Sequence, residues 1–320
     1  MKKILLSQKI NPAGMALLEN KYEVITAPDC SAETMLSLSK DVNAIILRTT
    51  SKVDREVIEK AQNLEIISRT GAGVDNVDIT AASKRKIIVC NLPRANNLSV
   101  CEHAISLMMM CAKSIQSMQN GVRQGNWKVR NVGTPVEIEG KTLGIVGMGH
   151  IGSLVAKKCH DGLGMRIIAY DPYVVEKYKD YDYHFCNTLE ELFAESDFVT
   201  LHCPNLPETK GMVTRELLFS MKSGAYLINT ARGTVVDEGA LIDLLKEKRI
   251  AAAGLDVFGQ EPPEAGNPLL NMENVVATPH SAALTKEASI RMSYEAAKAV
   301  DDYFSGKSPE YIYNKADLGI

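Results

Sequence analysis

The chain has 320 residues, of which 45% are hydrophobic, so it is long enough for about two domains with substantial apolar cores. The formal net charge is −3 and no Lys/Arg-rich block stands out, which argues against a nucleic-acid-binding surface. The longest apolar stretch, around residues 104–112, is shorter than the roughly 20 residues that cross a bilayer, so we expect no membrane partner.

The seven cysteines form no C-x-x-C pair, and most of them lie in apolar runs. An odd number without a spacing pattern is typical of free thiols in a reducing compartment. The N-terminal apolar run that follows Lys2 and Lys3 is too short for the core of a signal peptide and predicts a first strand. We therefore expect a cytoplasmic protein.

Residues 1–98 alternate short β-rich runs with helix candidates. Asn11, followed by Pro12, predicts the start of one helix, and Asp54 predicts the start of another. The alternation predicts a parallel sheet covered by helices. The strands expected here are 3–6, 23–26, 44–47, 65–68 and 87–90.

A long helix is predicted next. Ser99 and Glu102 have the spacing of a capping box, which predicts that this helix begins at residue 99 and extends to about 118. One of its faces is apolar and includes Met108, and we interpret that face as core or as a subunit interface. It makes a homodimer the leading expectation for assembly. Residues 121–141, rich in Gly, Asn and charge, predict a loop.

A glycine motif follows an apolar, strand-like stretch. Gly147, Gly149 and Gly152 have the spacing G-x-G-x-x-G, a helix-like stretch follows, and a second apolar run ends at Asp171. The glycines let backbone N–H groups approach a pyrophosphate at a helix N-terminus, and the acid accepts hydrogen bonds from a ribose. The pattern predicts a dinucleotide site that prefers NAD, because Asp171 repels a 2′-phosphate and Pro172-Tyr173 offers no neighbouring arginine.

The remaining chain continues the alternation of strands and helices. Thr188 with Glu191 forms a second capping box, and Asp237 predicts another helix start. Distinctive polar residues follow the expected strands, at the carboxyl ends where open α/β sheets bind ligands. The expected strands are 197–201, 225–229, 251–257 and 275–278, and a last amphipathic helix is expected over 286–305.

Three of these residues suit chemistry on a keto acid. Arg232 is either a surface arginine or a bidentate partner for a carboxylate. A lone histidine is more often structural, but His280 follows a strand end. Hydride delivery to a keto group needs a proton donor, and histidine as a residue type titrates near neutral pH. Glu261, beside Pro262-Pro263, is either a solvated turn acid or the carboxylate that orients His280.

Other catalytic motifs do not occur in the sequence. It contains no H-E-x-x-H or G-x-S-x-G, and the six histidines show no metal-ligand spacing, so no metal site is expected. Gly140-Lys141-Thr142 resembles the end of a P-loop. However, Pro135 stands where the earlier glycine belongs, and the strand follows this segment, so we interpret it as a turn.

Four segments together resemble the D-isomer-specific 2-hydroxyacid dehydrogenase family, most closely its phosphoglycerate dehydrogenase and hydroxypyruvate reductase branch. The likeness covers nearly the whole chain, in order. The segments are R-T-G-A-G-V-D-N-V-D at 69–78, the glycine motif with Asp171-Pro172, N-T-A-R-G at 229–233 with D-E-G-A-L at 237–241, and G-L-D-V-F at 254–258 through E-P-P to Pro279-His280.

The resemblance implies an α/β fold of two Rossmann-like doubly wound parallel-sheet domains, one inserted into the other. Residues 1–98 and 286–320 would form a flavodoxin-like substrate-binding domain, and residues 99–285 the NAD-binding domain. Arg232 would bind the substrate carboxylate and carbonyl, His280 would exchange the proton, and Glu261 would support His280.

The resemblance also implies contacts to NAD and to a small anionic substrate. Ala72 and Gly73 would offer backbone N–H groups to the substrate carboxylate. Arg48 and Arg69 match phosphate-binding arginines of the phosphoglycerate branch, or are ordinary ion-paired residues. Besides the three glycines of the motif, the matching cofactor positions are His150, Ile151, Asp171, Cys203, Thr230, Ala231 and Asp256, the last near the nicotinamide amide.

We therefore expect an NAD-dependent enzyme that interconverts a small 2-keto acid and its D-2-hydroxy acid, of the hydroxypyruvate/glyoxylate or 3-phosphoglycerate type. Two departures favour a general hydroxyacid reductase. No regulatory serine-binding domain follows the last helix, and Ser281-Ala282 replace the Leu-Gly that follows Pro-His in the phosphoglycerate branch.

Two alternatives stay open at this point. Some members of the superfamily are NAD-sensing binding proteins or corepressors and retain much of the same site. Another possibility is a Rossmann dehydrogenase that acts on amino acids, although the lysine-based motif of those enzymes is missing from the matching positions.

Overall fold

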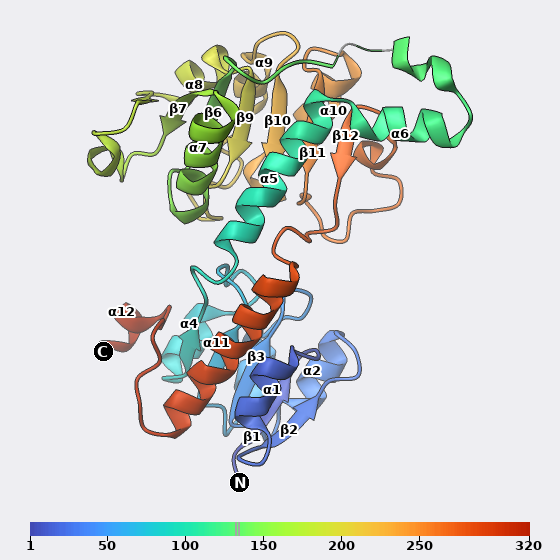
Figure 1. Ribbon diagram of the computed structural model, residues 1–320. Helices are drawn as coiled ribbons and strands as arrows, with labels where there is room; N and C mark the ends of the chain where they lie inside the picture. The colour runs from blue at the N-terminus through green and yellow to red at the C-terminus, as the bar shows by residue number, and fades with distance from the viewer. Residues whose placement is uncertain (132, 134) are drawn as a thin grey trace. The chain divides into compact units, whose positions relative to one another are not determined.

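The structure is a computed structural model that describes residues 1–131, 133 and 135–320. The chain divides into two compact units (Figure 1). Unit 1 comprises Met1–Asn96 and Ala283–Ile320, and unit 2 comprises Asn97–Ala282. Unit 2 is therefore inserted into the chain of unit 1.

The described residues of unit 1 contain a five-stranded parallel sheet with the order β2-β1-β3-β4-β5, which is the flavodoxin-like doubly wound order. Its central strands are buried along their whole length, as expected for a parallel sheet covered on both faces. The strands are β1 (Lys3–Leu6), β2 (Glu23–Thr26), β3 (Ala44–Leu47), β4 (Ile66–Arg69) and β5 (Ile88–Cys90).

Two helices of unit 1 begin at N-caps that the sequence predicted. The side chain of Asn11 accepts a hydrogen bond from Ala13 N, and that of Asp54 accepts one from Val57 N, so both predicted N-caps are confirmed. The helices are α1 (Pro12–Leu18), α2 (Ala32–Leu38), α3 (Arg55–Lys60), α4 (Ile79–Lys84), α11 (Lys286–Phe304) and α12 (Lys315–Leu318).

The second sheet, in unit 2, is seven-stranded and parallel in the described part of the chain, with the order β12-β11-β10-β9-β6-β7-β8. The order reverses at β6, which lies between β7 and β9, and a crevice for a dinucleotide lies at such a reversal. The predicted fold class is confirmed. The strands are β6 (Thr142–Val146), β7 (Arg166–Tyr170), β8 (Tyr183–Phe185), β9 (Phe198–Leu201), β10 (Tyr226–Asn229), β11 (Ala252–Leu255) and β12 (Val275–Ala277).

Two helices of unit 2 confirm predicted caps, because Thr188 accepts from Glu191 N and Asp237 accepts from Ala240 N. The helices are α5 (Asn97–Ala112), α6 (Ile115–Arg123), α7 (His150–Leu163), α8 (Leu189–Glu195), α9 (Arg215–Phe219) and α10 (Glu238–Lys246). Short 3-10 turns are η1 (Trp127–Asn131), η2 (Val175–Tyr178), η3 (Gly233–Val235) and η4 (Pro268–Asn271).

The long helix predicted over 99–118 differs from the structure in two ways. Helix α5 already begins at Asn97, so Ser99 is a buried residue of its first turn and the predicted capping box is wrong. The helix ends at Ala112, because Ser114 adopts a left-handed conformation with φ of 50°, and α6 continues after a bend of 63°. The predicted loop at 121–141 begins later, and residues 132 and 134 lie outside the described residues.

Among the described residues, no single helix is long and apolar enough to cross a membrane. Helices α5 and α6 meet that criterion only when they are taken together across their bend.

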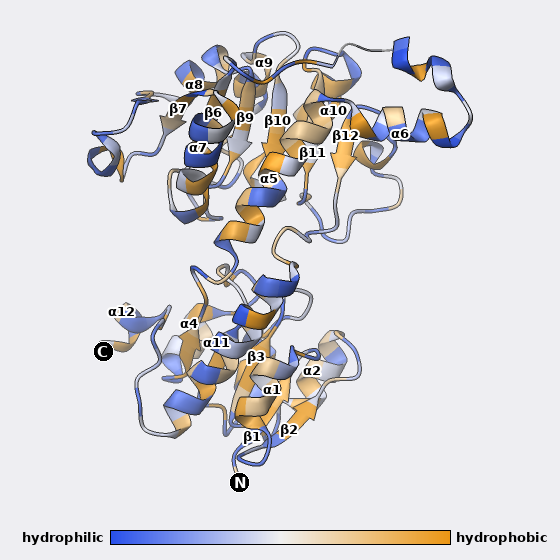
Figure 2. Ribbon diagram, in the orientation of Figure 1, coloured by the Kyte–Doolittle hydropathy of each residue, from blue (hydrophilic) through white to orange (hydrophobic). Residues whose placement is uncertain are grey.

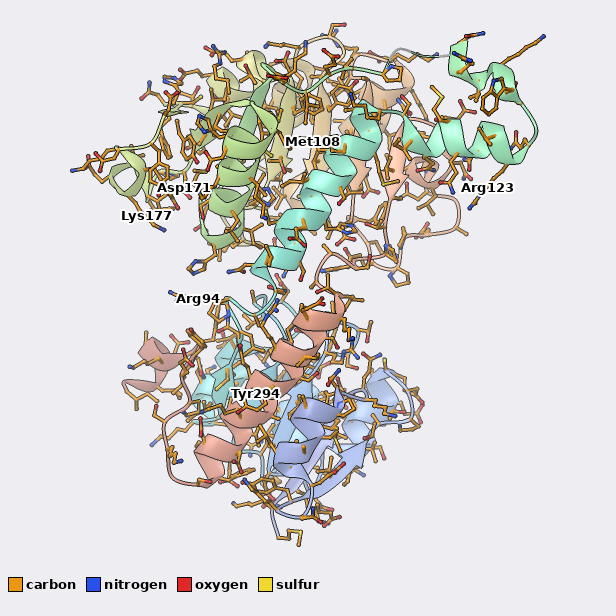
Figure 3. The ribbon with its side chains drawn as sticks, in the orientation of Figure 1. Arg94, Met108, Arg123, Asp171, Lys177 and Tyr294 are labelled. Carbon is orange, nitrogen blue, oxygen red and sulfur yellow. The ribbon has the colours of Figure 1, made fainter. Side chains whose placement is uncertain are left out.

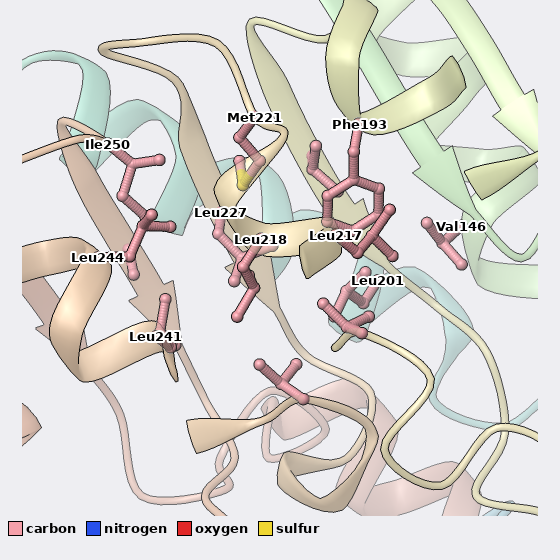
Figure 4. Packing of buried hydrophobic residues seen from close by; sticks show 14 of the residues in the cluster. Val146, Phe193, Leu201, Leu217, Leu218, Met221, Leu227, Leu241, Leu244 and Ile250 are labelled. Carbon is pink, nitrogen blue, oxygen red and sulfur yellow. The ribbon is translucent and has the colours of Figure 1, made fainter. Parts of the chain in front are cut away.

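The apolar face of α5 belongs to the core of unit 2. Met108, which Figure 3 labels on this helix, is 2% exposed and packs in a cluster with residues of α7 and of the sheet. The core interpretation of this face is confirmed, and the face is not available as a subunit interface. On the other side of the sheet, Phe193, Leu217 and Leu227 belong to a second cluster of buried apolar residues (Figure 4). Apolar residues concentrate in the strands of each sheet, whereas the helices combine polar and apolar faces (Figure 2).

Candidate active site

The polar residues singled out in unit 2 lie at one edge of its sheet. Because all its strands are parallel, the loops that follow them share the carboxyl edge. Gly147 follows β6, Asp171 follows β7, Cys203 follows β9, Thr230, Ala231 and Arg232 follow β10, Asp256 follows β11, and His280 follows β12.

The three motif glycines are required for different reasons. Gly147 has φ of +93°, and a Cβ there would lie 2.9 Å from Cys203 N. A Cβ on Gly152 would lie 2.0 Å from the carbonyl oxygen of Gly147, so no larger residue fits between helix and loop. A Cβ on Gly149, in contrast, would meet nothing within 4 Å.

Open space at Gly149 suits an anion. Gly149 is the N-cap of the 14-residue helix α7 and has no side chain to cap the first turn. The first backbone N–H groups of a helix and its dipole favour a phosphate at such a position. His150 and Ile151, two of the predicted cofactor positions, form the start of that turn. The residues present therefore fit the diphosphate of a dinucleotide.

Asp171 is fixed beside the glycine loop, after β7 (Figure 3). Its Oδ2 accepts a hydrogen bond of 2.9 Å from Met148 N, and its Oδ1 accepts one of 3.0 Å from Tyr173 N. The hydroxyl of Tyr178 donates to Met148 O over 3.1 Å, so the backbone N–H and the backbone carbonyl of Met148 are both hydrogen-bonded. Sequence reasoning missed Tyr178, because the segment 174–185 carried no recognised motif.

His280 and Glu261 form a direct pair. His280 Nδ1 lies 2.6 Å from Glu261 Oε2, and Glu261 Oε1 accepts a hydrogen bond of 3.1 Å from Phe258 N. The side chains are 29% and 34% exposed, so a ligand can reach them. Since Nδ1 faces the carboxylate, Nε2 is the ring nitrogen that can exchange a proton with a substrate.

The charge of Glu261 is stabilised in place. Burial raises its pKa, but the hydrogen bond and charge of His280, the Phe258 N–H and the charge of Arg232 outweigh burial and hold the pKa of Glu261 below its usual value. A carboxylate 2.6 Å from Nδ1 orients the imidazole.

A buried carboxylate anchors the turn that carries His280. Asp256 is 1% exposed, its backbone carbonyl accepts from His280 N over 2.8 Å, and its Oδ1 accepts from Ser281 N over 2.8 Å. The same Oδ1 accepts from Thr278 Oγ1 over 2.6 Å, and Oδ2 accepts from Ala282 N over 2.9 Å. These bonds hold His280 in a left-handed conformation with φ of 50°, which is uncommon for a residue other than glycine.

His103 of α5 extends this network. Its Nε2 lies 2.9 Å from Thr278 Oγ1 and 3.5 Å from Asp256 Oδ1. Because the Thr278 hydroxyl donates its hydrogen to Asp256, it accepts one from His103. Sequence reasoning missed His103 and Thr278, since their contact joins positions 175 residues apart and neither belongs to a motif.

Arg232 is positioned by its own turn and by the neighbouring loop. Asn229 accepts from Ala231 N over 3.0 Å and donates to Arg232 O over 3.0 Å. A Cβ on Gly233 would lie 1.9 Å from the carbonyl carbon of Phe258, so the two loops are in direct contact. Arg232, Glu261 and His280 therefore gather at one edge of unit 2.

The other predicted cofactor positions after β9 and β10 are mostly enclosed. Burial raises the pKa of the Cys203 thiol to about 11, so this thiol is neutral at ordinary pH. Thr230 and Ala231 are each 8% exposed, and Thr230 Oγ1 has no hydrogen-bond partner among the described residues. Cofactor contacts of these residues remain predictions.

The predicted substrate residues of unit 1 follow β3 and β4. Arg69 is 7% exposed and donates to Thr49 Oγ1 over 3.1 Å, while Arg48 donates to Lys9 O over 3.1 Å. A Cβ on Gly71 would lie 2.1 Å from Arg69 Nη1, so the guanidinium packs on the backbone that leads to Ala72 and Gly73. Substrate binding by these four residues remains a prediction.

Known proteins resemble this chain over most of its length. It is 38% identical over 319 residues to the D-3-phosphoglycerate dehydrogenase of Methanocaldococcus jannaschii, covering 99% of this chain and 60% of that protein. It is 38% identical over 298 residues to the hydroxypyruvate reductase of Thermotoga maritima, covering 92% and 96% of the two chains. The chain thus spans about 60% of the phosphoglycerate dehydrogenase and nearly all of the reductase.

A solved structure extends the comparison. The NADPH-dependent glyoxylate/hydroxypyruvate reductase of Sinorhizobium meliloti, in complex with NADP and malonate, matches with a TM-score of 0.87 and 27% identity over 99% of this chain and 97% of that one. Residues 105–282 match the model of the family "D-isomer specific 2-hydroxyacid dehydrogenase, NAD binding domain". The chain therefore belongs to the D-isomer-specific 2-hydroxyacid dehydrogenase family.

Proposed function

We propose that this protein is an NAD-dependent oxidoreductase that interconverts a small 2-keto acid and its D-2-hydroxy acid, of the hydroxypyruvate/glyoxylate or 3-phosphoglycerate type. The observation that carries the proposal is the 2.6 Å pair of His280 and Glu261 at the carboxyl edge of a dinucleotide-type sheet. The relatives named above are reductases and a dehydrogenase. None of them carries a corepressor name, so that alternative gains no support.

We assign a separate role in binding the cofactor or the substrate to each part of the site. NAD, when bound, supplies or accepts the hydride. The N-terminus of α7 would hold the diphosphate, and Asp171 would accept hydrogen bonds from the ribose hydroxyls. Arg232 binds the substrate carboxylate, and a charged hydrogen bond of this kind contributes about 1.5–3 kcal/mol.

Proton transfer is assigned to His280. In the reductive direction His280 Nε2 gives its proton to the keto oxygen as the keto carbon is reduced, and in the oxidative direction it takes the hydroxyl proton. Glu261 stabilises the protonated imidazole and fixes which nitrogen faces the substrate. Neither residue transfers the hydride.

The substrate proposal also includes residues of unit 1. Ala72 and Gly73 offer backbone N–H groups to the carboxylate, and Arg48 and Arg69 bind an anionic tail when the substrate carries one. Arg48→Ala and Arg69→Ala are then expected to weaken turnover of phosphohydroxypyruvate more than that of glyoxylate.

A substrate panel tests the function. Purified protein is given NADH or NADPH with hydroxypyruvate, glyoxylate, phosphohydroxypyruvate, pyruvate or 2-ketogluconate, and cofactor oxidation is followed. We expect turnover of at least one 2-keto acid, faster with NADH, and loss of this preference in Asp171→Ala. No turnover of any member would contradict the proposal, and faster oxidation of NADPH would contradict the role of Asp171.

We also propose that the protein is a cytoplasmic homodimer. The seven cysteines are free, and six of them are buried, which agrees with a reducing compartment.

The dimer proposal is based on the segment of α6 and η1, where Ile115, Val122 and Trp127 are 46%, 52% and 69% exposed. Exposed apolar patches mark protein interfaces. Sedimentation equilibrium of the wild type should give twice the chain mass, and Trp127→Ser should shift it toward the monomer; a monomeric wild type would contradict the dimer.

A further inference from the structure

We propose that His184, Cys186 and Glu191 form a binding site for a thiophilic divalent cation such as Zn²⁺. One ligand atom of each residue lies within 4.8 Å of the other two. The three donors are an imidazole nitrogen, a thiol sulfur and a carboxylate oxygen, which is a set that zinc accepts. The site lies wholly within unit 2 and shares no residue with the candidate active site.

The local fold brings these residues together. His184 lies in the edge strand β8 and Cys186 follows it two residues later, so the two side chains point to the same face of the sheet. Cys186 is still tied to the sheet, because its N–H donates to Ala169 O over 2.8 Å. Helix α8 begins at Leu189, and its first turn places Glu191 beside them.

The distance between the two exposed ligands agrees with tetrahedral coordination. His184 Nε2 and Glu191 Oε1 are 3.4 Å apart, which is long for a hydrogen bond. Two ligands at about 2.1 Å from a tetrahedral zinc are separated by about 3.4 Å. A nitrogen and a sulfur ligand of a tetrahedral zinc are separated by about 3.6 Å. The ligand atoms of the three residues all lie within 4.8 Å of one another. Even at that limit, the sulfur and the nitrogen would need to approach each other by only about 1 Å to reach the zinc geometry.

One ligand is already oriented. Glu191 Oε2 accepts a hydrogen bond of 2.8 Å from Asn187 N, and the Thr188 cap fixes the start of the same helix. A hydrogen bond to the second oxygen of a ligating carboxylate is a usual supporting contact of metal sites. Oε1 is therefore directed toward His184 by the capping box itself.

The exposure of the three residues and the charge around them favour a cation that enters the site from solvent. The His184 side chain is 61% exposed and that of Glu191 is 30% exposed, whereas Cys186 is 6% exposed. An ion can thus enter from solvent, keep a water as fourth ligand and reach the sulfur at the base of the site. Glu191 and the neighbouring Glu195 supply negative charge beside the sulfur, which favours a cation there.

Cobalt substitution tests the proposal without any substrate. Chelator-treated full-length protein is titrated with Co²⁺, whose thiolate charge-transfer band and visible bands report sulfur ligation and tetrahedral geometry. Zn²⁺ affinity is measured by competition with a chromophoric chelator. We expect one equivalent of Co²⁺, loss of the thiolate band in Cys186→Ser, and at least about tenfold weaker Zn²⁺ binding in His184→Ala.

Matched controls separate the site from other thiols and histidines. Cys30→Ser removes a thiol that is partly exposed, unlike the buried Cys186, and His160→Ala removes a partly exposed histidine paired with Asp161. Neither change is expected to alter the titration. If Cys186→Ser fails to fold, the exposed His184→Ala carries the test. The proposal is overturned if the wild type binds no stoichiometric cation, or if the thiolate band survives in Cys186→Ser; His184 and Glu191 would then be only an ion pair beside a core cysteine.

Discussion

His280 Nδ1 lies 2.6 Å from Glu261 Oε2, in a turn whose backbone is held by the buried Asp256. The pair leaves His280 Nε2 for the substrate, so the two residues have separable effects. Removing the imidazole would delete the proposed proton donor, whereas neutralising the carboxylate would leave that donor with a weaker orientation.

We expect His280→Ala to lower kcat by about 10²–10⁴-fold, because a positioned general acid contributes that much. Glu261→Gln should lower kcat by a smaller factor and shift the pH dependence of kcat, since the protonated imidazole loses its counter-charge. Steady-state kinetics across pH and NADH titration by fluorescence check both. Turnover of His280→Ala comparable to wild type, with intact NADH binding, would refute the acid–base role.

The glycines of the loop and of α7 provide a matched set of alanine variants. Gly152→Ala places a Cβ 2.0 Å from Gly147 O, so it should destabilise unit 2 and weaken NADH binding. Gly162→Ala, in the same helix with nothing within 4 Å, should be neutral or stabilising by up to about 1 kcal/mol.

Gly149→Ala separates binding from folding. Its Cβ meets no protein atom within 4 Å, so the variant should unfold like the wild type, yet a diphosphate at the start of α7 would be displaced. We expect the Kd for NADH to rise at least about tenfold, which corresponds to about 1.4 kcal/mol. Wild-type affinity in Gly149→Ala would show that the diphosphate lies elsewhere.

The network of His103, Thr278 and Asp256 should act through the position of His280. Thr278→Val removes the hydroxyl that joins His103 to Asp256, and we expect a fall in kcat of roughly tenfold or more with little change in the KM for NADH. Thr278→Ser keeps the hydroxyl and should restore most of the activity. If Thr278→Ser is as impaired as Thr278→Val, the methyl packing matters and the hydrogen bonds do not.

His202 should make unit 2 sensitive to acid. Burial lowers the pKa of His202 from 6.5 to about 3, so between these values the unfolded chain binds a proton that the folded chain does not. Stability should therefore fall as pH decreases below 6.5, by up to about 1.4 kcal/mol per pH unit for one proton.

Urea unfolding at about pH 7 and about pH 5.5 measures this slope, within the window that the histidine pKa sets. His202→Gln should reduce the mean slope between these pH values by about 0.6 proton. The control His160→Gln, at a partly exposed position, should have a smaller effect. If wild type and His202→Gln have equal slopes, His202 takes up a proton in the folded protein as readily as in the unfolded chain over this pH range, and the prediction is wrong.

The sequence predicted most of the elements because their signals are local. The caps at Asn11, Asp54, Thr188 and Asp237 each depend on a side chain and a backbone N–H two or three residues away, and all four are confirmed. Ser99 has the same pattern but lies inside α5, because its helix begins two residues earlier and buries it. A motif of spacing alone cannot distinguish a capping serine from a packed one.

The site was predicted in part, and the missing part is long-range. The strand order puts Asp171, Arg232, Asp256 and His280 at one edge, so residues after strand ends were found from the sequence. The contact between His103 and Thr278 joins a helix to a strand end far along the chain, and no local pattern encodes it. Strand β8 was also missed, because it is only three residues long and none of them is buried. The proximity of His184, Cys186 and Glu191 was missed with it.

The insertion of unit 2 imposes an order on folding during synthesis. Unit 2 is one continuous stretch and is complete once Ala282 has emerged from the ribosome. Unit 1 supplies its five strands first but needs α11, which packs on α1 and β4, and Asn314, which accepts from Val89 N and donates to Ile87 O. Until α11 is synthesised, the face of the first sheet that it covers stays partly exposed, although α1 packs on the same side. A chain halted after residue 282 would leave apolar residues of that face open to aggregation.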